Sequence, residues 1–437
     1  MQYNSKIFVA GHNGTAGSAL VKRLNELGYN NIITRNRSEL DLCNQNEVKT
    51  FFEKEKLDYV FFAAVLPCGA SNFRQKADFI YQNTAMQINI IHSCFKYEIK
   101  KLITYGSGYM YPYLAKNPLK EECMLTGELE YNATPFGVAK INQALMCESY
   151  NLQYGTNFLC LALNNLYGTR ANFNFNKSRV LPALLRKFHL AKLLSLGDEQ
   201  AILLDLNANL DNNESKINSF DEALLFLNSW GISKDKVEIW GTGKVRREFL
   251  HSQDLADASI FVMQNVNFKD LYKNNTEIKN THINVGTGID YPIKEVALMV
   301  QKQVGFGGEI YFNTNRPDSS MDRLMDCSRI NELGWKAQIS LSEGIDKMYQ
   351  YYKQNIATIN FTNGGGGLNL NRFIVLKFIL LYITNILHQR IIFIFLSSIG
   401  TKVLRNVLFY NRLFISQNII KKFSQNKETL YEYAKKF

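Results

Sequence analysis

The apolar run Lys6-Ile-Phe-Val-Ala10 leads directly into Gly11-His-Asn-Gly14-Thr-Ala-Gly17, and residues 18–27 then carry leucine and valine at helical spacing. A strand, a glycine-rich turn and a helix in this order are typical of a dinucleotide-binding unit. Glycines let the backbone turn tightly and approach a pyrophosphate at the helix N-terminus. The pattern therefore predicts dinucleotide binding, and the alternative is a turn in which the glycines serve packing alone.

Strands and helices continue to alternate after this unit. Strand patterns occur at residues 31–34, 59–64, 101–105 and 157–163. Helical patterns occur at residues 45–55, 77–97, 136–150 and 181–190. Strands that are separated by helices form a parallel sheet covered on both faces. The sequence therefore predicts an α/β fold with a Rossmann-type doubly wound parallel sheet.

The end of the second predicted strand favours one dinucleotide. Arg35 and Arg37 stand where an NAD-binding protein usually carries an acidic residue for the ribose 2′-hydroxyl. A guanidinium suits a 2′-phosphate, so we expect NADP(H); the alternative is two solvated surface arginines. The residues predicted here to bind the cofactor are Gly11, Gly14, Gly17, Arg35, Arg37, Ala63 and Ala64.

Composition separates a body from a tail. The 437 residues are 46% apolar and 20% charged, which is a globular mixture. The whole chain has 50 basic and 39 acidic side chains, and residues 363–437 hold 11 of the basic and 2 of the acidic ones. The body therefore has 39 basic and 37 acidic side chains, a net charge of +2. This near-neutral body argues against a nucleic-acid-binding protein.

The cysteines and the N-terminus favour a reducing compartment. The seven cysteines stand singly without a C-x-x-C pair, which predicts thiols and neither a disulfide scaffold nor a metal site. The residues before the first strand leave no room for the apolar region of a signal peptide, so we expect a cytoplasmic protein. The cysteines are Cys43, Cys68, Cys94, Cys123, Cys147, Cys160 and Cys327.

Ordered motifs over about residues 5–355 carry a family resemblance. Besides the glycine-rich turn and Arg35-Asn-Arg37-Ser-Glu-Leu, they are Gly106-Ser107-Gly-Tyr-Met-Tyr-Pro112, Asn164-Asn165-Leu-Tyr-Gly168, Leu181-Pro-Ala-Leu-Leu-Arg-Lys-Phe-His189, Trp240-Gly-Thr-Gly243, Arg247-Glu-Phe-Leu-His251, Arg316-Pro-Asp318 and Leu333-Gly-Trp335. With them the chain resembles the GDP-L-fucose synthases, extended short-chain dehydrogenase/reductases that act on GDP-4-keto-6-deoxy sugars. It also resembles the reductases that Campylobacter-type bacteria use on GDP-heptoses for capsule building.

The resemblance implies an organisation for the body. It places an NADP-binding domain at residues 1–180, to which some later segments return, and a GDP-sugar-binding lobe at 181–355 with an insertion at about 195–237. Asp211-Asn-Asn-Glu-Ser reads as an exposed loop between two helical stretches of that insertion. The resemblance also implies a homodimer formed through the helices around 85–97 and 136–150. The residues that it places at the GDP-sugar are Asn165, Arg179, Lys187, Trp240, Arg247 and Arg323; without it, Trp240 would read as core.

Three catalytic positions depart from the family pattern. The family Tyr-x-x-x-Lys is Phe136-Gly-Val-Ala-Lys140 here, so the lysine that also holds the nicotinamide ribose is present and the proton-donating hydroxyl is missing. The family cysteine and histidine, which epimerise carbons beside the ketone, correspond to Tyr109 and Arg179. Arginine is a poor proton shuttle, so we expect little C3/C5 epimerisation, with Arg179 binding a pyrophosphate or a sugar hydroxyl.

The catalytic residues predicted from this comparison are Ser107, Tyr109 and Lys140. Ser107 matches the family serine that hydrogen-bonds the ketone. Tyr109 is the predicted substitute proton donor; the alternatives are Tyr131, a water held by Lys140, or a Tyr109 ring that only fills space above the sugar.

The predicted function is an NADPH-dependent 4-ketoreductase of a GDP-4-keto-6-deoxy sugar, hexose or heptose, for capsule or surface polysaccharide. An isomerising enzyme is disfavoured by the loss of both epimerisation groups. The other alternative is a catalytically impaired paralogue that binds GDP-sugar or NADP as a partner or regulator. Phe136 favours that alternative, and the intact Ser107 and Lys140 disfavour it.

The tail after Asn363-Gly-Gly-Gly-Gly367 has a composition of its own. Its apolar stretches at 373–387 and 391–399 are shorter than the roughly 18–20 clean residues of a membrane-spanning helix. Basic and apolar side chains together predict peripheral contact of residues 372–420 with an anionic membrane surface. The alternatives are a helix that packs on a partner, and an accidental extension caused by a slip in a guanine tract that encodes the glycines.

Overall fold

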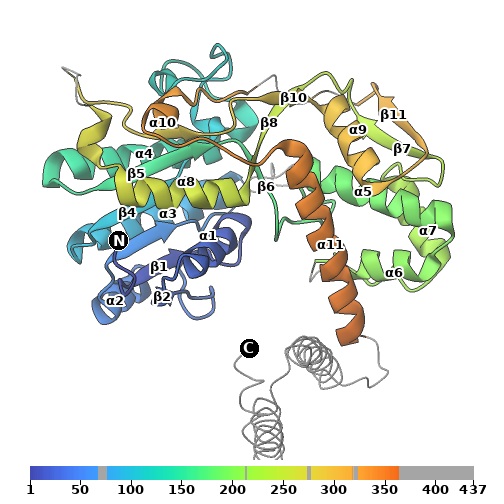
Figure 1. Cartoon of the computed structure of the whole chain (residues 1–437), viewed down its shortest axis with the longest axis horizontal. Coiled ribbons are helices and arrows are strands. Elements are labelled where there is room, and N and C mark those ends of the chain that lie inside the picture. Colours follow the sequence, from blue (N-terminus) through green and yellow to red (C-terminus); the bar gives the residue numbers. More distant parts are fainter. Residues whose placement is uncertain (67–75, 212–213, 273–276, 317, 319–322, 364–437) are drawn as a thin grey trace, which may run out of the picture. The chain divides into compact units, whose positions relative to one another are not determined.

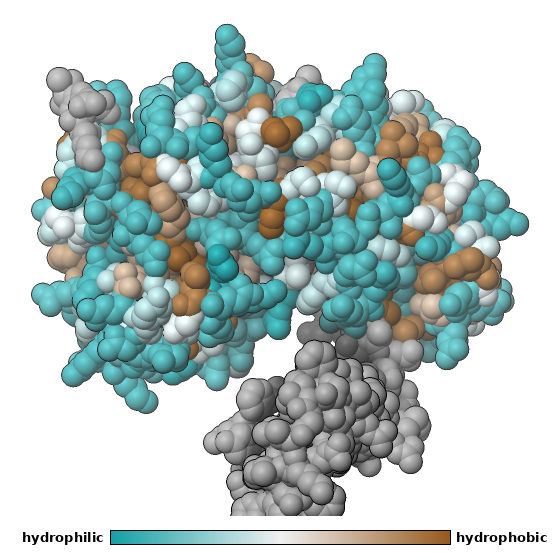
Figure 2. All heavy atoms as spheres, viewed as in Figure 1, coloured by the Kyte–Doolittle hydropathy of each residue, from teal (hydrophilic) through white to brown (hydrophobic). Residues whose placement is uncertain are grey.

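The computed structural model describes residues 1–363 except for 67–75, 212–213, 273–276, 317 and 319–322. Cys68, Pro317 and the tail from residue 364 onward, with its predicted membrane contact, lie outside the described residues. Within the described part of the chain, no helix is long and apolar enough to cross a membrane. The face of the body in Figure 2 is mostly hydrophilic, with apolar side chains in separate clusters.

A parallel sheet forms the N-terminal half of the body, as the alternating pattern predicts. Among the described residues it has six strands in the order β2-β1-β3-β4-β5-β9, and every neighbouring pair is parallel. The α/β prediction is confirmed (Figure 1). Strand β2 is shorter than expected, and β9 comes from far downstream in the sequence. The strands are β1 Ile7–Ala10, β2 Ile32–Ile33, β3 Tyr59–Phe62, β4 Lys101–Tyr105, β5 Phe158–Leu163 and β9 Ile283–Val285.

Helices cover both faces of this sheet because its strands are apolar on both faces. Ile7 and Val9 of β1 pack with α1 (Thr15–Glu26) and α8 (Ser252–Asn265) in one core. Phe8 and Ala10 pack on the opposite side with helices α2, α3 and α4. These helices span Gln45–Glu55 (α2), Lys76–Lys96 (α3) and Thr134–Tyr154 (α4). The continuous apolar run at the start of the chain is therefore a strand buried on both sides.

A second lobe has its own core. It contains α5 (Val180–Leu196), α9 (Ile293–Val304) and the parallel pair of β7 (Lys236–Trp240) and β11 (Glu309–Asn313). A further pairing, in the order β10-β8-β6, joins segments of both halves of the sequence. The remaining elements are β6 Asn165–Tyr167, β8 Arg246–His251, β10 Asp290–Pro292, α10 Ser328–Glu332, α11 Leu341–Asn363 and the 3-10 helices η2 Gly108–Met110, η3 Glu121–Cys123, η4 Tyr131–Ala133 and η5 Phe268–Leu271.

The insertion predicted at about 195–237 is part of this second core. Its helices α6 (Glu199–Ala208) and α7 (Phe220–Ser229) bury Ile202 and Leu227 fully. A buried ion pair also fastens it, because Nε of Arg186 on α5 donates to Oδ1 of Asp205 on α6 at 2.9 Å. The hydroxyl of Tyr352 on α11 donates to the other carboxylate oxygen of Asp205. The insertion is therefore an integral layer of the lobe.

Candidate active site

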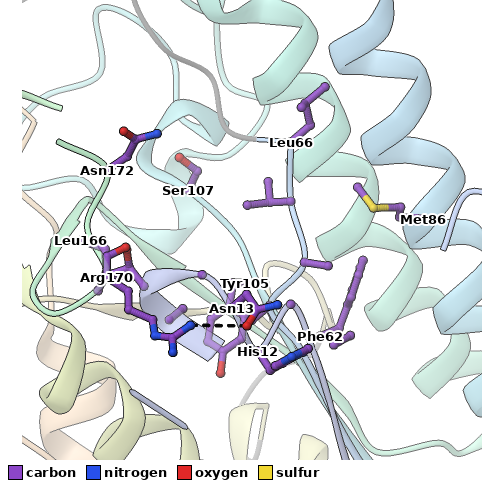
Figure 3. Close-up of a pocket in the computed structure, with 18 of the residues that line it drawn as sticks. His12, Asn13, Phe62, Leu66, Met86, Tyr105, Ser107, Leu166, Arg170 and Asn172 are labelled. Carbon is purple, nitrogen blue, oxygen red and sulfur yellow. Dashed lines mark hydrogen bonds between the residues drawn. The ribbon is translucent and has the colours of Figure 1, made fainter. Parts of the chain in front are cut away.

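One open cavity of about 1320 Å³ follows the carboxyl ends of β1, β3, β4 and β5 and continues onto the second lobe. At this edge of a parallel sheet, the turns that follow the strands converge on a shared crevice. Its lining therefore combines residues from distant parts of the sequence, and Figure 3 shows a portion of it.

The glycine-rich turn forms one end of the cavity. Gly11 has a φ of +83°, and a Cβ there would lie 2.5 Å from the backbone nitrogen of Ala64. A Cβ on Gly17 would overlap the carbonyl oxygen of Gly11, so this residue is required for packing and does not line the cavity. The first N–H groups of α1, behind Gly14, have no acceptor within the helix. This backbone cradle fits the diphosphate of a dinucleotide.

The two arginines after β2 differ in their partners. Both line the cavity, as do Ala63 and Ala64. Nη2 of Arg35 donates to Oε1 of Glu55 at 2.8 Å and Nη1 donates to a backbone carbonyl, whereas Arg37 is 71% exposed and lies 3.8 Å from Asp41. Lys6 and then Arg35 lower the pKa of Glu55. Arg37 is therefore the more accessible cation for a 2′-phosphate.

Ser107, Phe136 and Lys140 lie together where β4 ends against α4. The hydroxyl oxygen of Ser107 accepts a hydrogen bond from the backbone nitrogen of Tyr109 at 3.3 Å, as η2 begins. Nζ of Lys140 donates to the carbonyl of Tyr105 at 2.7 Å and to Oε1 of Gln143 at 3.0 Å. Burial lowers the pKa of Lys140 to about 8.

Tyr109 is held between an aromatic edge and a cation. Its ring meets that of Phe136 edge-on, with the ring centroids 6.1 Å apart. The guanidinium carbon of Arg323 lies 4.9 Å from the Tyr109 ring centroid. Arg323 in turn donates to the carbonyl of Gly108 at 2.7 Å and to Oε2 of Glu130 at 3.0 Å. The backbone of Tyr109 can lie this close to helix α4 only because residue 137 is glycine, since a Cβ there would lie 2.5 Å from the Tyr109 carbonyl oxygen.

The rival donor Tyr131 lies elsewhere. It is 80% exposed on η4, does not line the cavity, and has Nζ of Lys76 at 4.2 Å from its ring centroid. The structure therefore brings Tyr109 to Ser107 and Lys140 and leaves Tyr131 at the surface.

The residues expected at the GDP-sugar divide into two groups. Asn165, Arg179, Arg247 and Arg323 line the cavity, while Lys187 and Trp240 do not. Nζ of Lys187 is buried and donates to the carbonyls of Trp230 and Glu238 at 2.6 and 2.9 Å, and burial lowers its pKa to about 8.

Trp240 is 50% exposed, so the core position that its residue type alone suggests is wrong. One face is stacked on Trp230 at a centroid distance of 6.4 Å, and the guanidinium carbon of Arg316 lies 4.9 Å from its centroid. The pair forms an aromatic platform on the second lobe.

A buried carboxylate that the sequence patterns did not predict positions the cavity wall. Glu248 is fully buried and accepts hydrogen bonds from the backbone nitrogens of Thr287, Gly288 and Met325 and from Nδ2 of Asn164. It therefore joins three segments that border the substrate end. In the sequence, the one indication of this role is that a glutamate stands beside the apolar residues of a strand pattern.

The insertion also reaches the cavity, which sequence reasoning did not predict. Asp211 and Glu214 line it, and both are half-buried although their loop was expected to be exposed. Oδ2 of Asp211 pairs with Nζ of Lys177 at 2.6 Å, and Glu214 accepts from the side-chain amides of Asn174 and Asn176 at 2.7 Å. The insertion therefore contributes polar groups to the second-lobe end.

Known proteins of one family are similar to this chain over the residues that form the sheet and the cavity. The model of the NAD dependent epimerase/dehydratase family matches residues 7–286. The GDP-L-fucose synthase of Escherichia coli K12 is 37% identical over 351 residues, which are 80% of this chain and 97% of that protein.

Two solved structures from Campylobacter jejuni are more similar. A GDP-6-OMe-4-keto-L-xylo-heptose reductase is 63% identical with a TM-score of 0.77, covering 81% of this chain and 99% of that one. A GDP-mannoheptose C4 reductase with NADP bound is 61% identical with a TM-score of 0.72, at the same coverage.

Proposed function

This chain belongs to the NAD dependent epimerase/dehydratase family and, within it, to the GDP-L-fucose synthases, and we propose from that membership that it is an NADPH-dependent 4-ketoreductase of a GDP-linked keto sugar. The observation that carries the proposal is that one cavity joins the dinucleotide cradle to Ser107, Tyr109 and Lys140. The NADP-bound relative supports the same cofactor here.

Each of three residues in the cavity has a different role in the proposed reduction. Bound NADPH supplies the hydride. Ser107 donates a hydrogen bond to the ketone oxygen and stabilises the developing alkoxide. Tyr109 gives that oxygen its proton, and the neighbouring guanidinium of Arg323 stabilises the charge left on the phenol. Lys140, two of whose ammonium hydrogens bond the protein, contributes its third to the cofactor ribose.

We propose a GDP-4-keto-heptose as the substrate and keep the 6-deoxy-hexose as the alternative. The two similar reductases of Campylobacter jejuni act on GDP-linked heptoses, and their identity to this chain is above 60%. Arg179 and Arg247 place cations along the cavity for a doubly anionic diphosphate, whereas Arg323 pairs with Glu130 beside Tyr109. Asp211 and Glu214 supply acceptors for sugar hydroxyls.

Little epimerisation is expected from this site. Tyr109 and Arg179 occupy the positions of the two family epimerisation groups, and a guanidinium does not release a proton near neutral pH. The substrate would therefore reach this enzyme with its C3 and C5 stereochemistry already set by a separate epimerase.

The test is loss of NADPH absorbance with a GDP-4-keto-heptose or with GDP-4-keto-6-deoxy-mannose, each with and without a separate C3/C5 epimerase. Oxidation that requires the epimerase supports a dedicated reductase. Oxidation of either sugar without it, together with solvent deuterium at C3 or C5, contradicts the loss of epimerisation. Tight NADPH binding without any oxidation favours the impaired paralogue.

A homodimer is proposed through α3 and α4. These helices contact each other and expose large apolar side chains, including Ile88 at 43%, Leu152 at 51% and Tyr154 at 49%. A second copy with the same face would cover them. Sedimentation of the full chain should give a dimer, and Leu152→Lys should shift it toward monomer, whereas the exposed Leu225→Lys on α7 should not.

The cellular setting is a cytoplasmic step in capsule or surface polysaccharide synthesis, where sugar nucleotides are made. The basic, apolar composition of residues 372–420 supports peripheral membrane contact. Cell fractionation that compares the full chain with one stopped at Thr362 tests it. Equal membrane fractions for both proteins would refute a role of the tail.

A further inference from the structure

Arg170 is a cationic side chain at the glycine-rich turn that the function described above does not use. It follows β6 and Gly168 and has a left-handed backbone φ of 57°. Its carbonyl oxygen accepts from Oγ1 of Thr15 at 3.1 Å, and its Nη1 donates to Oδ1 of Asn13 at 3.4 Å. Figure 3 shows its guanidinium beside Asn13 and near His12.

The glycine-rich turn provides little positive charge of its own. The N-cap of α1 is Gly14, which has no side chain, and His12 is the titratable residue of the turn. Burial and then the proximity of Arg170 lower the pKa of His12, which disfavours the charged form of this imidazole. A formal positive charge at the turn therefore comes from Arg170.

The guanidinium of Arg170 is also available to a ligand. The residue is exposed and lines the cavity. Among the described residues no carboxylate lies within salt-bridge distance of it, whereas Arg35 pairs with Glu55 and Arg323 pairs with Glu130. The hydrogen bond to Asn13 is long at 3.4 Å, and a phosphate oxygen would replace this neutral amide acceptor by an anionic one with two-point geometry.

We propose that Arg170 binds the diphosphate of NADPH beside the glycine-rich turn, next to Asn13. The backbone N–H groups at the start of α1 contribute partial charges, and the guanidinium contributes a full charge and a two-pronged donor. The proposal rests on the assignment of NADPH as cofactor. It adds a cofactor-binding side chain from residues 168–179, a segment that continues to the part of the cavity where we expect the substrate.

The diphosphate is common to NADPH and NADH, whereas the 2′-phosphate belongs to NADPH alone. A side chain that binds the diphosphate therefore contributes equally to the binding of NADPH and of NADH. A side chain that binds the 2′-phosphate contributes to the binding of NADPH alone. Arg37, exposed beside the expected 2′-phosphate position, is the matched control for Arg170.

The experiment is a fluorescence titration of the full chain with NADPH and with NADH, without any sugar nucleotide. For Arg170→Gln we expect both dissociation constants to rise by the same factor, about tenfold. Arg170→Lys, which keeps the charge, should remain within about threefold of the parent. Arg37→Gln should weaken NADPH alone, and thermal melts of all variants should match the parent.

Two results overturn the proposal. If both dissociation constants of Arg170→Gln stay within a factor of about two of the parent values, Arg170 does not bind the cofactor. If only the affinity for NADPH falls, Arg170 binds the 2′-phosphate and not the diphosphate. A parent protein that binds neither dinucleotide refutes the cofactor assignment itself. Failure of the proposed function and failure of this inference are therefore distinguishable.

Discussion

The guanidinium of Arg323 lies over the ring of Tyr109, with its central carbon 4.9 Å from the ring centroid. Two hydrogen bonds, to the carbonyl of Gly108 and to Glu130, hold it there. A cation against a phenol stabilises the negative charge that appears when the phenol gives up its proton. This contact is a physical reason to propose Tyr109 as the proton donor in a site where Phe136 replaces the tyrosine of the family pattern.

Tyr109→Phe should lower kcat by about 10²-fold or more, because a general acid contributes roughly 10² to 10⁴ to a rate. The dissociation constant of NADPH should not change, since the ring itself remains. Steady-state NADPH oxidation measures the first quantity and fluorescence titration the second. Tyr131→Phe is the control and should keep the parent rate; a Tyr109→Phe enzyme with full activity would refute the donor assignment.

Arg323→Met should lower kcat about tenfold when Tyr109 is present, because the phenolate loses its neighbouring charge. In a Tyr109→Phe background the same change should have a much smaller effect on kcat. A double-mutant cycle measures this coupling. Equal effects in both backgrounds would mean that Arg323 acts on the substrate independently of Tyr109.

The rate should fall as pH rises past the pKa of Lys140, which burial lowers to about 8. The active form is the ammonium, which donates to the carbonyl of Tyr105, to Gln143 and to the ribose, so activity is present below this pKa and is lost above it. A profile of kcat/KM from pH 6 to 10 checks this sign. A profile that stays flat to about pH 9.5 would show that the Lys140 proton is not required.

Gly14→Ala and Gly17→Ala separate the two interpretations of the glycine-rich turn. A Cβ on Gly17 would overlap the Gly11 carbonyl, so Gly17→Ala should destabilise the fold by about 1–3 kcal/mol. A Cβ on Gly14 meets that oxygen only at 3.5 Å, so Gly14→Ala should melt like the parent. It should bind NADPH more weakly, because Gly14 lines the cavity at the proposed diphosphate position. Denaturation curves and NADPH titrations measure the pair; unchanged NADPH affinity of Gly14→Ala would favour a packing role alone.

Asp205→Asn should destabilise the second lobe by about 3–5 kcal/mol, since it leaves the buried Arg186 guanidinium without its counter-charge. Guanidinium chloride denaturation measures the loss. Glu26→Gln removes the partner of two exposed pairs, with Lys22 and Arg23, and should cause no measurable change. Equal stabilities of the two variants would contradict the role of the buried pair.

Local patterns predicted the parallel sheet and its cofactor end well. The apolar strands, the glycine-rich turn and the helix at residues 45–55 depend on spacing and turn chemistry within short segments, and each recurs in the structure with small shifts of its bounds. The family resemblance added Ser107 and Lys140, which do line the cavity together. These features depend on residues that are close in sequence or on motifs that keep their order.

Other parts of the site depended on contacts between distant segments. The positions of Arg170 at the turn, of Arg323 over Tyr109 and of Asp211 on the cavity wall join residues far apart in the chain, and no local period encodes them. The same reason explains Trp240, whose type suggests core although a neighbouring tryptophan covers only one face. Propensity and spacing specify which elements form, whereas side-chain partners across the fold specify which charges remain available for a ligand.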